Sequence, residues 1–126
     1  MTWTVTNTLR DHLAGGGSLQ SAMNGGSLRI YNSGATLLSS HAVGTTSVTT
    51  NVVTVPFNNA TVAAGVSNQT ANNAEIRNSS AAVLLSTNNV GTTGADIAFN
   101  QVTGWNAGDT VDPGDASITL TVSIAT

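Results

Sequence analysis

Few side chains in this chain of 126 residues could carry acid–base or nucleophilic chemistry. The only histidines are His12 and His41, and there is no cysteine. Asp11 and Ser40 directly precede them, but adjacent side chains diverge on a helix and point to opposite faces on a strand. Nucleophilic catalysis needs a nucleophile within reach of its base, and neither pair provides this. We therefore expect a structural role for both histidines, no catalytic residue and no enzymatic activity.

The one acidic cluster consists of Asp109, Asp112 and Asp115 around a Pro-Gly pair. Calcium prefers oxygen ligands, so three carboxylates within seven residues could converge on this cation. The segment lacks the spacing of an EF-hand loop and contains no glutamate. Aspartate, proline and glycine are also ordinary turn residues, and a plain loop explains the same pattern. We predict no metal site and no cofactor, with the three aspartates kept as calcium candidates.

Composition restricts the partners further. Only 7% of the residues are charged, with three arginines, no lysine and a formal net charge of −3. Nucleic-acid-binding proteins neutralise phosphates with clustered basic side chains, and anionic membranes attract polybasic segments. Three scattered arginines do neither, and no apolar run has the length of a membrane span or signal peptide. We expect no nucleic-acid partner, no membrane partner and synthesis in the cytoplasm.

The elements that position these residues begin with a short strand and a short helix in residues 1–26. Apolar and polar residues alternate at 3–6, which is typical of a strand. Apolar residues then follow at near-helical spacing, with Asn7 or Thr8 as the expected N-cap. Three glycines at 15–17 end this helix, because each costs about 1 kcal/mol in a helix interior. Residues 19–23 allow one further helical turn.

Residues 27–126 have the pattern of β structure throughout. Apolar and polar residues alternate at 28–31 and 74–77, and most regularly at 117–124. Residues 48–55 are predicted to form one strand. The phase of its apolar residues changes between Val52 and Val53, which a bulge or burial on both faces would explain. Ile97 and Phe99 are expected to point inward from a further strand.

These elements predict an all-β fold. About eight strands at regular spacing, with no helices between them, indicate an antiparallel β-sandwich or jelly-roll-like fold with a short helical N-terminal segment. The length of the chain fits a single domain over residues 1–126, with the N-terminal strand and helix in 1–26 and the sandwich in 27–126.

The outward faces of the predicted strands carry threonine and serine where charged residues would be usual. Charged side chains normally protect sheet edges from pairing with other chains. Uncharged edges therefore indicate that another chain covers them. We expect partner contacts at Trp3, Arg10 and Trp105. For Trp105, in a predicted loop, a core position and a partner contact fit the sequence equally well.

Several short segments, taken in order, resemble small virion proteins of tailed bacteriophages, the group that includes capsid decoration (cement) proteins. These segments are Thr8-Leu9-Arg10, residues 26–32, residues 37–39, residues 74–78, residues 90–97 and residues 108–111. The resemblance implies a structural protein on the capsid surface of a virion. Its implied partner is the major capsid protein, and a homo-oligomer, with a trimer favoured, is also implied.

The expected function is decoration of the phage head, with the protein bound to its outer surface and stabilising the major capsid protein lattice. A repeated lattice allows a modest interface to gain from multivalency. The alternative is a phage tail component or a host-surface carbohydrate-binding adhesin, which a β-sandwich with exposed asparagine and threonine loops would also suit.

Overall fold

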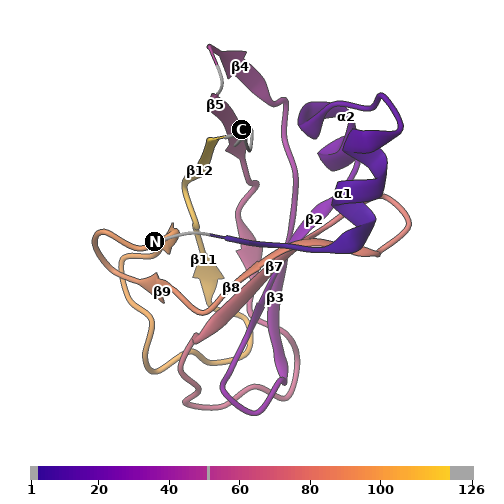
Figure 1. The fold of residues 1–126 in the computed structure, drawn as a ribbon. Helices are drawn as coiled ribbons and strands as arrows, with labels where there is room; N and C mark the ends of the chain where they lie inside the picture. The colour runs from indigo at the N-terminus through magenta and orange to yellow at the C-terminus, as the bar shows by residue number, and fades with distance from the viewer. Residues whose placement is uncertain (1–2, 51, 120–126) are drawn as a thin grey trace.

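The computed structural model describes the backbone of residues 3–50 and 52–119 and the side chains of residues 3–50 and 52–114. Strands predominate over helices (Figure 1), and the protein is of the all-β class. The helices are α1 (Asn7–Ala14) and α2 (Leu19–Met23). The strands are β1 (Thr4–Val5), β2 (Ser27–Tyr31), β3 (Leu37–Ala42), β4 (Ser47–Thr49), β5 (Val52–Pro56), β6 (Ala60–Thr61), β7 (Asn73–Arg77), β8 (Val83–Thr87), β9 (Val90–Gly91), β10 (Ile97–Ala98), β11 (Thr110–Val111) and β12 (Asp115–Thr119).

Helix α1 begins one to two residues earlier than the sequence predicts. Its N-cap is Thr6, whose hydroxyl oxygen accepts a hydrogen bond from the backbone N–H of Leu9. The same hydroxyl lies 2.6 Å from the carbonyl oxygen of Val83 and 3.0 Å from that of Leu84, both on β8. The predicted caps, Asn7 and Thr8, are wrong because this contact with β8, far away in the sequence, selects Thr6.

The larger sheet has five antiparallel strands in the order β1-β8-β7-β2-β3. Leu28 on β2 lies opposite Ile76 on β7, which in turn lies opposite Leu85 on β8. All three side chains are buried. The predicted alternation of residues 28–31 and 74–77 is confirmed, because buried positions there alternate with partly exposed ones.

The smaller sheet has three antiparallel strands in the order β12-β5-β4. The prediction of one strand over residues 48–55 is wrong, because β4 and β5 form a hairpin there. Thr49 pairs with Val52, so the chain reverses within two residues. Thr50 has a left-handed φ of 55°. Such turns usually carry glycine, asparagine or aspartate at this position, and the threonine concealed the turn.

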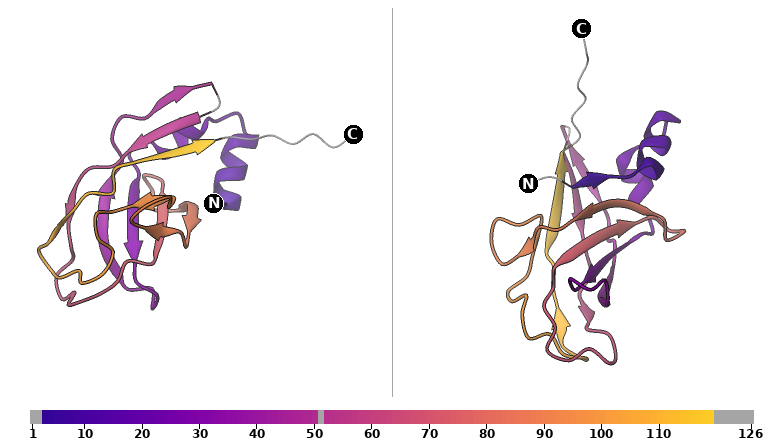
Figure 2. Two further views of the ribbon diagram at one scale, coloured as in Figure 1. Left: turned by 90° about the vertical axis from the view of Figure 1, so that its left-hand side faces the viewer. Right: turned by 60° about the horizontal axis from the view of Figure 1, so that its bottom comes forward.

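Figure 2 shows β12 beside β5, while α1 and α2 lie together at one end of the molecule. The sequence predicts that β12 continues as the alternating series Leu120, Val122 and Ile124. These three residues lie outside the described residues.

Two short pairs complete the fold. β11 pairs with β6 in the antiparallel sense, whereas β10 pairs with β9 in the parallel sense. The expectation of a wholly antiparallel arrangement is therefore wrong for β9 and β10. The backbone N–H groups of Asp96 and Ile97 both donate to the carbonyl oxygen of Asn89, so the loop between the two strands closes on itself.

The buried side chains form one cluster that extends along the chain from Leu9 to Trp105. The largest fully buried side chains are those of Leu9, Met23, Leu28, Ile30, Leu38, His41, Val55, Ile76, Leu84, Leu85 and Ile97. Phe99 and Trp105 meet edge to face, with ring centroids 4.9 Å apart. The inward orientation predicted for Ile97 and Phe99 is confirmed.

Candidate functional site

His41 and Ser39 form a hydrogen-bonded pair inside the molecule. Ser39 Oγ lies 2.8 Å from His41 Nε2, and His41 Nδ1 lies 2.8 Å from the carbonyl oxygen of Asn58. A carbonyl only accepts, so Nδ1 carries the proton and Nε2 accepts from the serine hydroxyl. The sequence reasoning examined Ser40 and missed Ser39, although residues two apart on a strand share a face.

This pair has the connectivity of a nucleophile and its base, but it lacks access to a substrate. His41 is 0% exposed and Ser39 is 2% exposed. Burial lowers the pKa of His41, while the hydrogen bond to Asn58 and the negative charge of Asp112 act in the opposite direction. The geometry therefore supports a structural role, with the imidazole joining β3 to the segment that follows β5.

His12 connects the two helices. Its Nε2 lies 2.9 Å from Ser21 Oγ and 3.1 Å from the carbonyl oxygen of Ser18, the N-cap of α2. A Cβ at Gly17 would lie only 2.2 Å from this nitrogen, so a side chain there would displace the imidazole from its contacts with α2. Gly17 thus has a packing role in addition to the helix-ending role predicted from the sequence.

The aspartates proposed as calcium ligands stabilise turns where they are described. Asp109 Oδ2 accepts the backbone N–H of Asn106 at 3.0 Å, and Asp112 Oδ1 accepts that of Gly114 at 2.9 Å. The side chain of Asp115 lies outside the described residues. Within residues 3–50 and 52–114, no three histidine, cysteine or acidic side chains gather as a metal would need.

A pocket of about 340 Å³ lies next to these turns. Asp109 and Asp112 line it together with Phe99, Gln101 and Trp105. Both aromatic rings are almost fully buried, so they present little surface to the pocket.

The three residues predicted to contact a partner differ in how exposed their side chains are. Trp105 is 3% exposed and its Nε1 donates to the carbonyl oxygen of Gln101 at 2.9 Å. Of the two alternatives for Trp105, the core position is correct and the partner contact is wrong. Trp3 is half-buried against the core, and Arg10 is exposed on α1, with Nη1 3.2 Å from Asn7 Oδ1. A partner contact at either residue stays a prediction.

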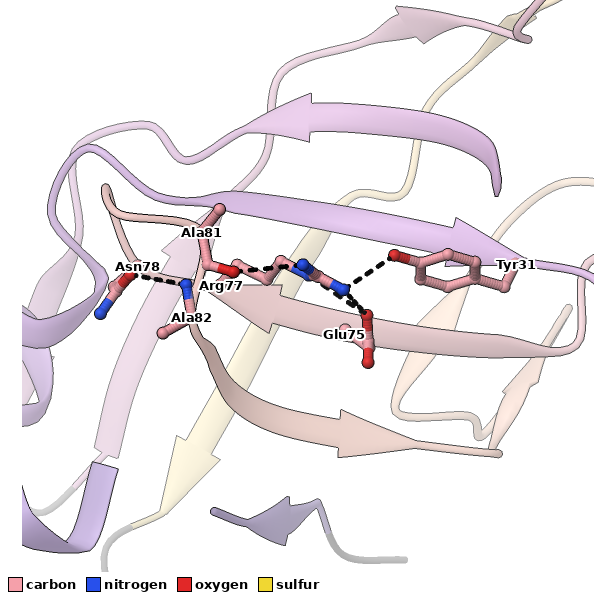
Figure 3. Close-up of polar contacts among 6 residues, drawn as sticks. All are labelled: Tyr31, Glu75, Arg77, Asn78, Ala81 and Ala82. Carbon is pink, nitrogen blue, oxygen red and sulfur yellow. Dashed lines mark hydrogen bonds and ion pairs between the residues drawn. The ribbon is translucent and has the colours of Figure 1, made fainter. Parts of the chain in front are cut away.

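The outward face of β7 carries a charged cluster (Figure 3). Arg77 Nη2 lies 2.8 Å from Glu75 Oε1 and 3.2 Å from the hydroxyl of Tyr31, and Arg77 Nη1 donates to the carbonyl oxygen of Ala81. The hydrogen bond to Glu75 is the main cause that raises the pKa of Arg77. The cluster joins β2, β7 and the turn after β7. Because its groups satisfy one another, it supports the sheet and provides no reactive group.

Of the large apolar side chains in residues 3–50 and 52–114, the most exposed lies on strand β4, at the edge of the smaller sheet. Val48 is 51% exposed at the centre of β4, and both its neighbours in that strand are exposed. A groove of about 610 Å³ adjoins the start of β4, between residues 18–25 around α2 and residues 43–46. The sequence reasoning predicted uncharged edges without identifying which strand forms the exposed one, because strand order is a tertiary property.

Comparison with known proteins gives no assignment: no family model, no curated protein and no solved structure matches this chain. The resemblance to phage virion proteins therefore stays an interpretation of short motifs. Among the described residues, neither helix has the length and apolar character required to cross a membrane. On the described surface, the edge strand β4 is the feature best suited to contact another chain.

Proposed function

We propose that this protein is a structural component of a virion, a decoration protein that binds the outer surface of a phage head. Its role is to stabilise the lattice of the major capsid protein. The observation that carries this proposal is the exposed, uncharged edge strand β4, with Val48 at its centre. Such an edge offers backbone donors and acceptors to a neighbouring chain. The motif resemblance supplies the identity of that neighbour.

The proposed architecture is a β-sandwich of the jelly-roll-like kind predicted from the sequence. Leu28 and Ile76 on the five-stranded sheet belong to the same buried cluster as Val53 and Val55 on β5. Two sheets that bury their inner faces against each other would give this distribution. A sandwich supports the proposed role because loops and edges remain available for contacts with neighbouring subunits.

The proposed mechanism is lattice bridging. Each copy makes a modest contact with adjacent capsid subunits, and the repeated lattice multiplies its effect because later contacts become intramolecular. The low charge of the chain favours this arrangement, since a surface with few charges loses little hydration when another protein covers it.

The test is a cryo-EM map of the native particle, paired with a particle that lacks this protein. We expect density for the chain on the outer head surface, and earlier release of the genome on heating when the chain is absent. Density confined to the tail, or equal heat resistance of the two particles, would contradict the proposal.

The alternative function is a tail component or carbohydrate-binding adhesin. The observation in its favour is the pocket beside Asp109 and Asp112, where carboxylates and an amide side chain from Gln101 line one cavity. Polar groups that converge in a cavity can orient a ligand rich in hydroxyl groups. A glycan array tests this function. Specific binding that is lost in Asp112→Asn would support it, and a uniform background would exclude it for the glycans on the array.

A further inference from the structure

The edge strand β4 is open along one side. Within the described part of the chain, it pairs with β5 alone, from Ser47 opposite Thr54 to Thr49 opposite Val52. An edge strand directs every second pair of backbone N–H and C=O groups away from its sheet. Charged residues, prolines or bulges usually block such an edge, and the sequence Ser-Val-Thr of β4 contains none of these.

The groove that ends at Thr46, directly before β4, restricts which segments could extend along this edge. Residues 43–46 form one wall and lead directly into β4, while residues 18–25 form the other wall, and all of these are uncharged. Gln20 Nε2 donates to the carbonyl oxygen of Thr46 at 2.9 Å and holds the walls together at one point. A charged segment would lose hydration here and gain no partner. The chemistry therefore favours an extended and uncharged occupant.

Residues 120–126 of this chain have that chemistry. Their sequence, Leu-Thr-Val-Ser-Ile-Ala-Thr, is uncharged and alternates apolar with hydroxyl-bearing side chains up to position 124. β-branched residues in such an alternation favour strands. At about 3.3 Å per residue, seven residues in extended form reach about 23 Å, which is ample for the three residues of β4.

The register of β12 shows why the occupied edge would belong to another copy. β12 pairs with β5 as far as Thr119 opposite Val52, and Val52 is the first residue of β5. Among the described residues, β5 offers no strand position beyond this pair. β12 and β4 lie on opposite sides of β5. To reach the open edge of its own β4, residues 120–126 would have to turn around the β4–β5 hairpin, whereas a second copy requires no such reversal.

We propose that residues 120–126 of one copy add as a strand to the open edge of β4 of a second copy. Main-chain hydrogen bonds to β4 provide the affinity, and contact with Val48 provides specificity. Each copy offers one segment and one edge, so the contact is heterologous, and it closes into a ring or continues as a filament. This inference concerns self-association in solution. The capsid proposal uses the same edge of β4, so on a particle the two contacts would compete for it.

The first test measures the mass of the full chain and its variants by sedimentation velocity. We expect the full chain to associate and a chain that ends at Thr119 to stay monomeric. Val122→Pro keeps the length of the segment but removes a main-chain donor, and Val48→Lys places a charge on the edge. We expect both to weaken association by about tenfold or more, equivalent to at least about 1.4 kcal/mol. Leu37→Lys, at the only other large apolar side chain exposed in the described region, is the matched control and keeps association unchanged.

The second test mixes two variants that have lost different halves of the contact. The chain ending at Thr119 retains an intact β4 edge, and Val48→Lys retains an intact segment. We expect an equal mixture to form dimers with one copy of each and nothing larger, because no second edge or segment remains. A mixture that stays monomeric would overturn the proposal. So would a full chain that is monomeric at every concentration, or a truncated chain that associates as the full chain does.

Discussion

Replacement of His41 by glutamine tests whether the buried imidazole makes the stability of the fold depend on pH. Burial lowers the pKa of His41 in the folded chain, whereas the unfolded chain has the ordinary value of about 6.5. The unfolded state therefore binds more protons in the interval below about pH 6.5, and stability must fall as the pH falls. The contribution of the neutral imidazole is fully present above that pH.

The magnitude follows from the titration of one proton. A histidine that stays neutral in the folded state and titrates normally when unfolded makes unfolding easier by at most about 1.4 kcal/mol between about pH 7.5 and about pH 5.5. His41→Gln removes the titrating group, so we expect most of this dependence to disappear.

His41→Gln also changes stability at neutral pH. His41 makes two hydrogen bonds of 2.8 Å, one of them with the buried hydroxyl of Ser39. Loss of a partner for a buried polar group costs about 1–3 kcal/mol. We expect the variant to be less stable by this amount at about pH 7.5. Its free energy of unfolding should also change less with pH than that of the unaltered chain.

The assay is urea unfolding followed by tryptophan fluorescence across this pH range, at one protein concentration, because association would shift the apparent stability. His12→Gln is the comparison variant: it replaces the exposed histidine and leaves the contacts of His41 in place, so the part of the pH dependence that comes from His41 should remain. If His41→Gln unfolds with the same pH dependence as the unaltered chain, the buried imidazole is not its source.

Three further predictions concern the stability of the fold. Each is measured by urea unfolding followed by circular dichroism. Trp105→Phe should destabilise the fold by about 1–3 kcal/mol, because the hydrogen bond to the Gln101 carbonyl is lost and the smaller ring leaves space in the core. An unchanged midpoint would contradict this. Gly26→Ala should cost about 1–3 kcal/mol or more, since its Cβ would lie 2.1 Å from a backbone oxygen, whereas Gly91→Ala has ordinary contacts and should be nearly neutral. Thr6→Ala should cost about 1 kcal/mol through loss of the N-cap, with reduced helical signal.

The local elements could be predicted where the pattern in the sequence is itself local. The alternation at 28–31 and 74–77 predicted β2 and β7, because one buried face imposes a period of two. The three glycines at 15–17 correctly predicted the end of α1. The ion pair between Glu75 and Arg77 also follows from local spacing, since residues two apart share a strand face.

The errors occur where distant parts of the chain decide the outcome. The hairpin within residues 48–55 is an exception, because its turn is local. Thr50 concealed the turn, and a phase slip in one strand produces the same change in apolar pattern. Trp105 could not be assigned to core or surface from its sequence neighbours. Its packing against Phe99 and its hydrogen bond to the Gln101 carbonyl depend on how the loop folds. The pairing of Ser39 with His41 could have been predicted, because residues two apart on a strand share a face. The burial of the pair could not be predicted from this spacing.

The sequence by itself determined the composition of the surface, the scarcity of reactive groups and the alternation that produces strands. These properties depend on residue type and on periodicity, which the chain carries locally. The tertiary structure alone decided strand order, and with it which uncharged strand remains at an edge. β4 is open because β5 lies on one side of it and no strand of the described residues lies on the other. Pairing between distant segments sets that arrangement, so its location is a property of the fold.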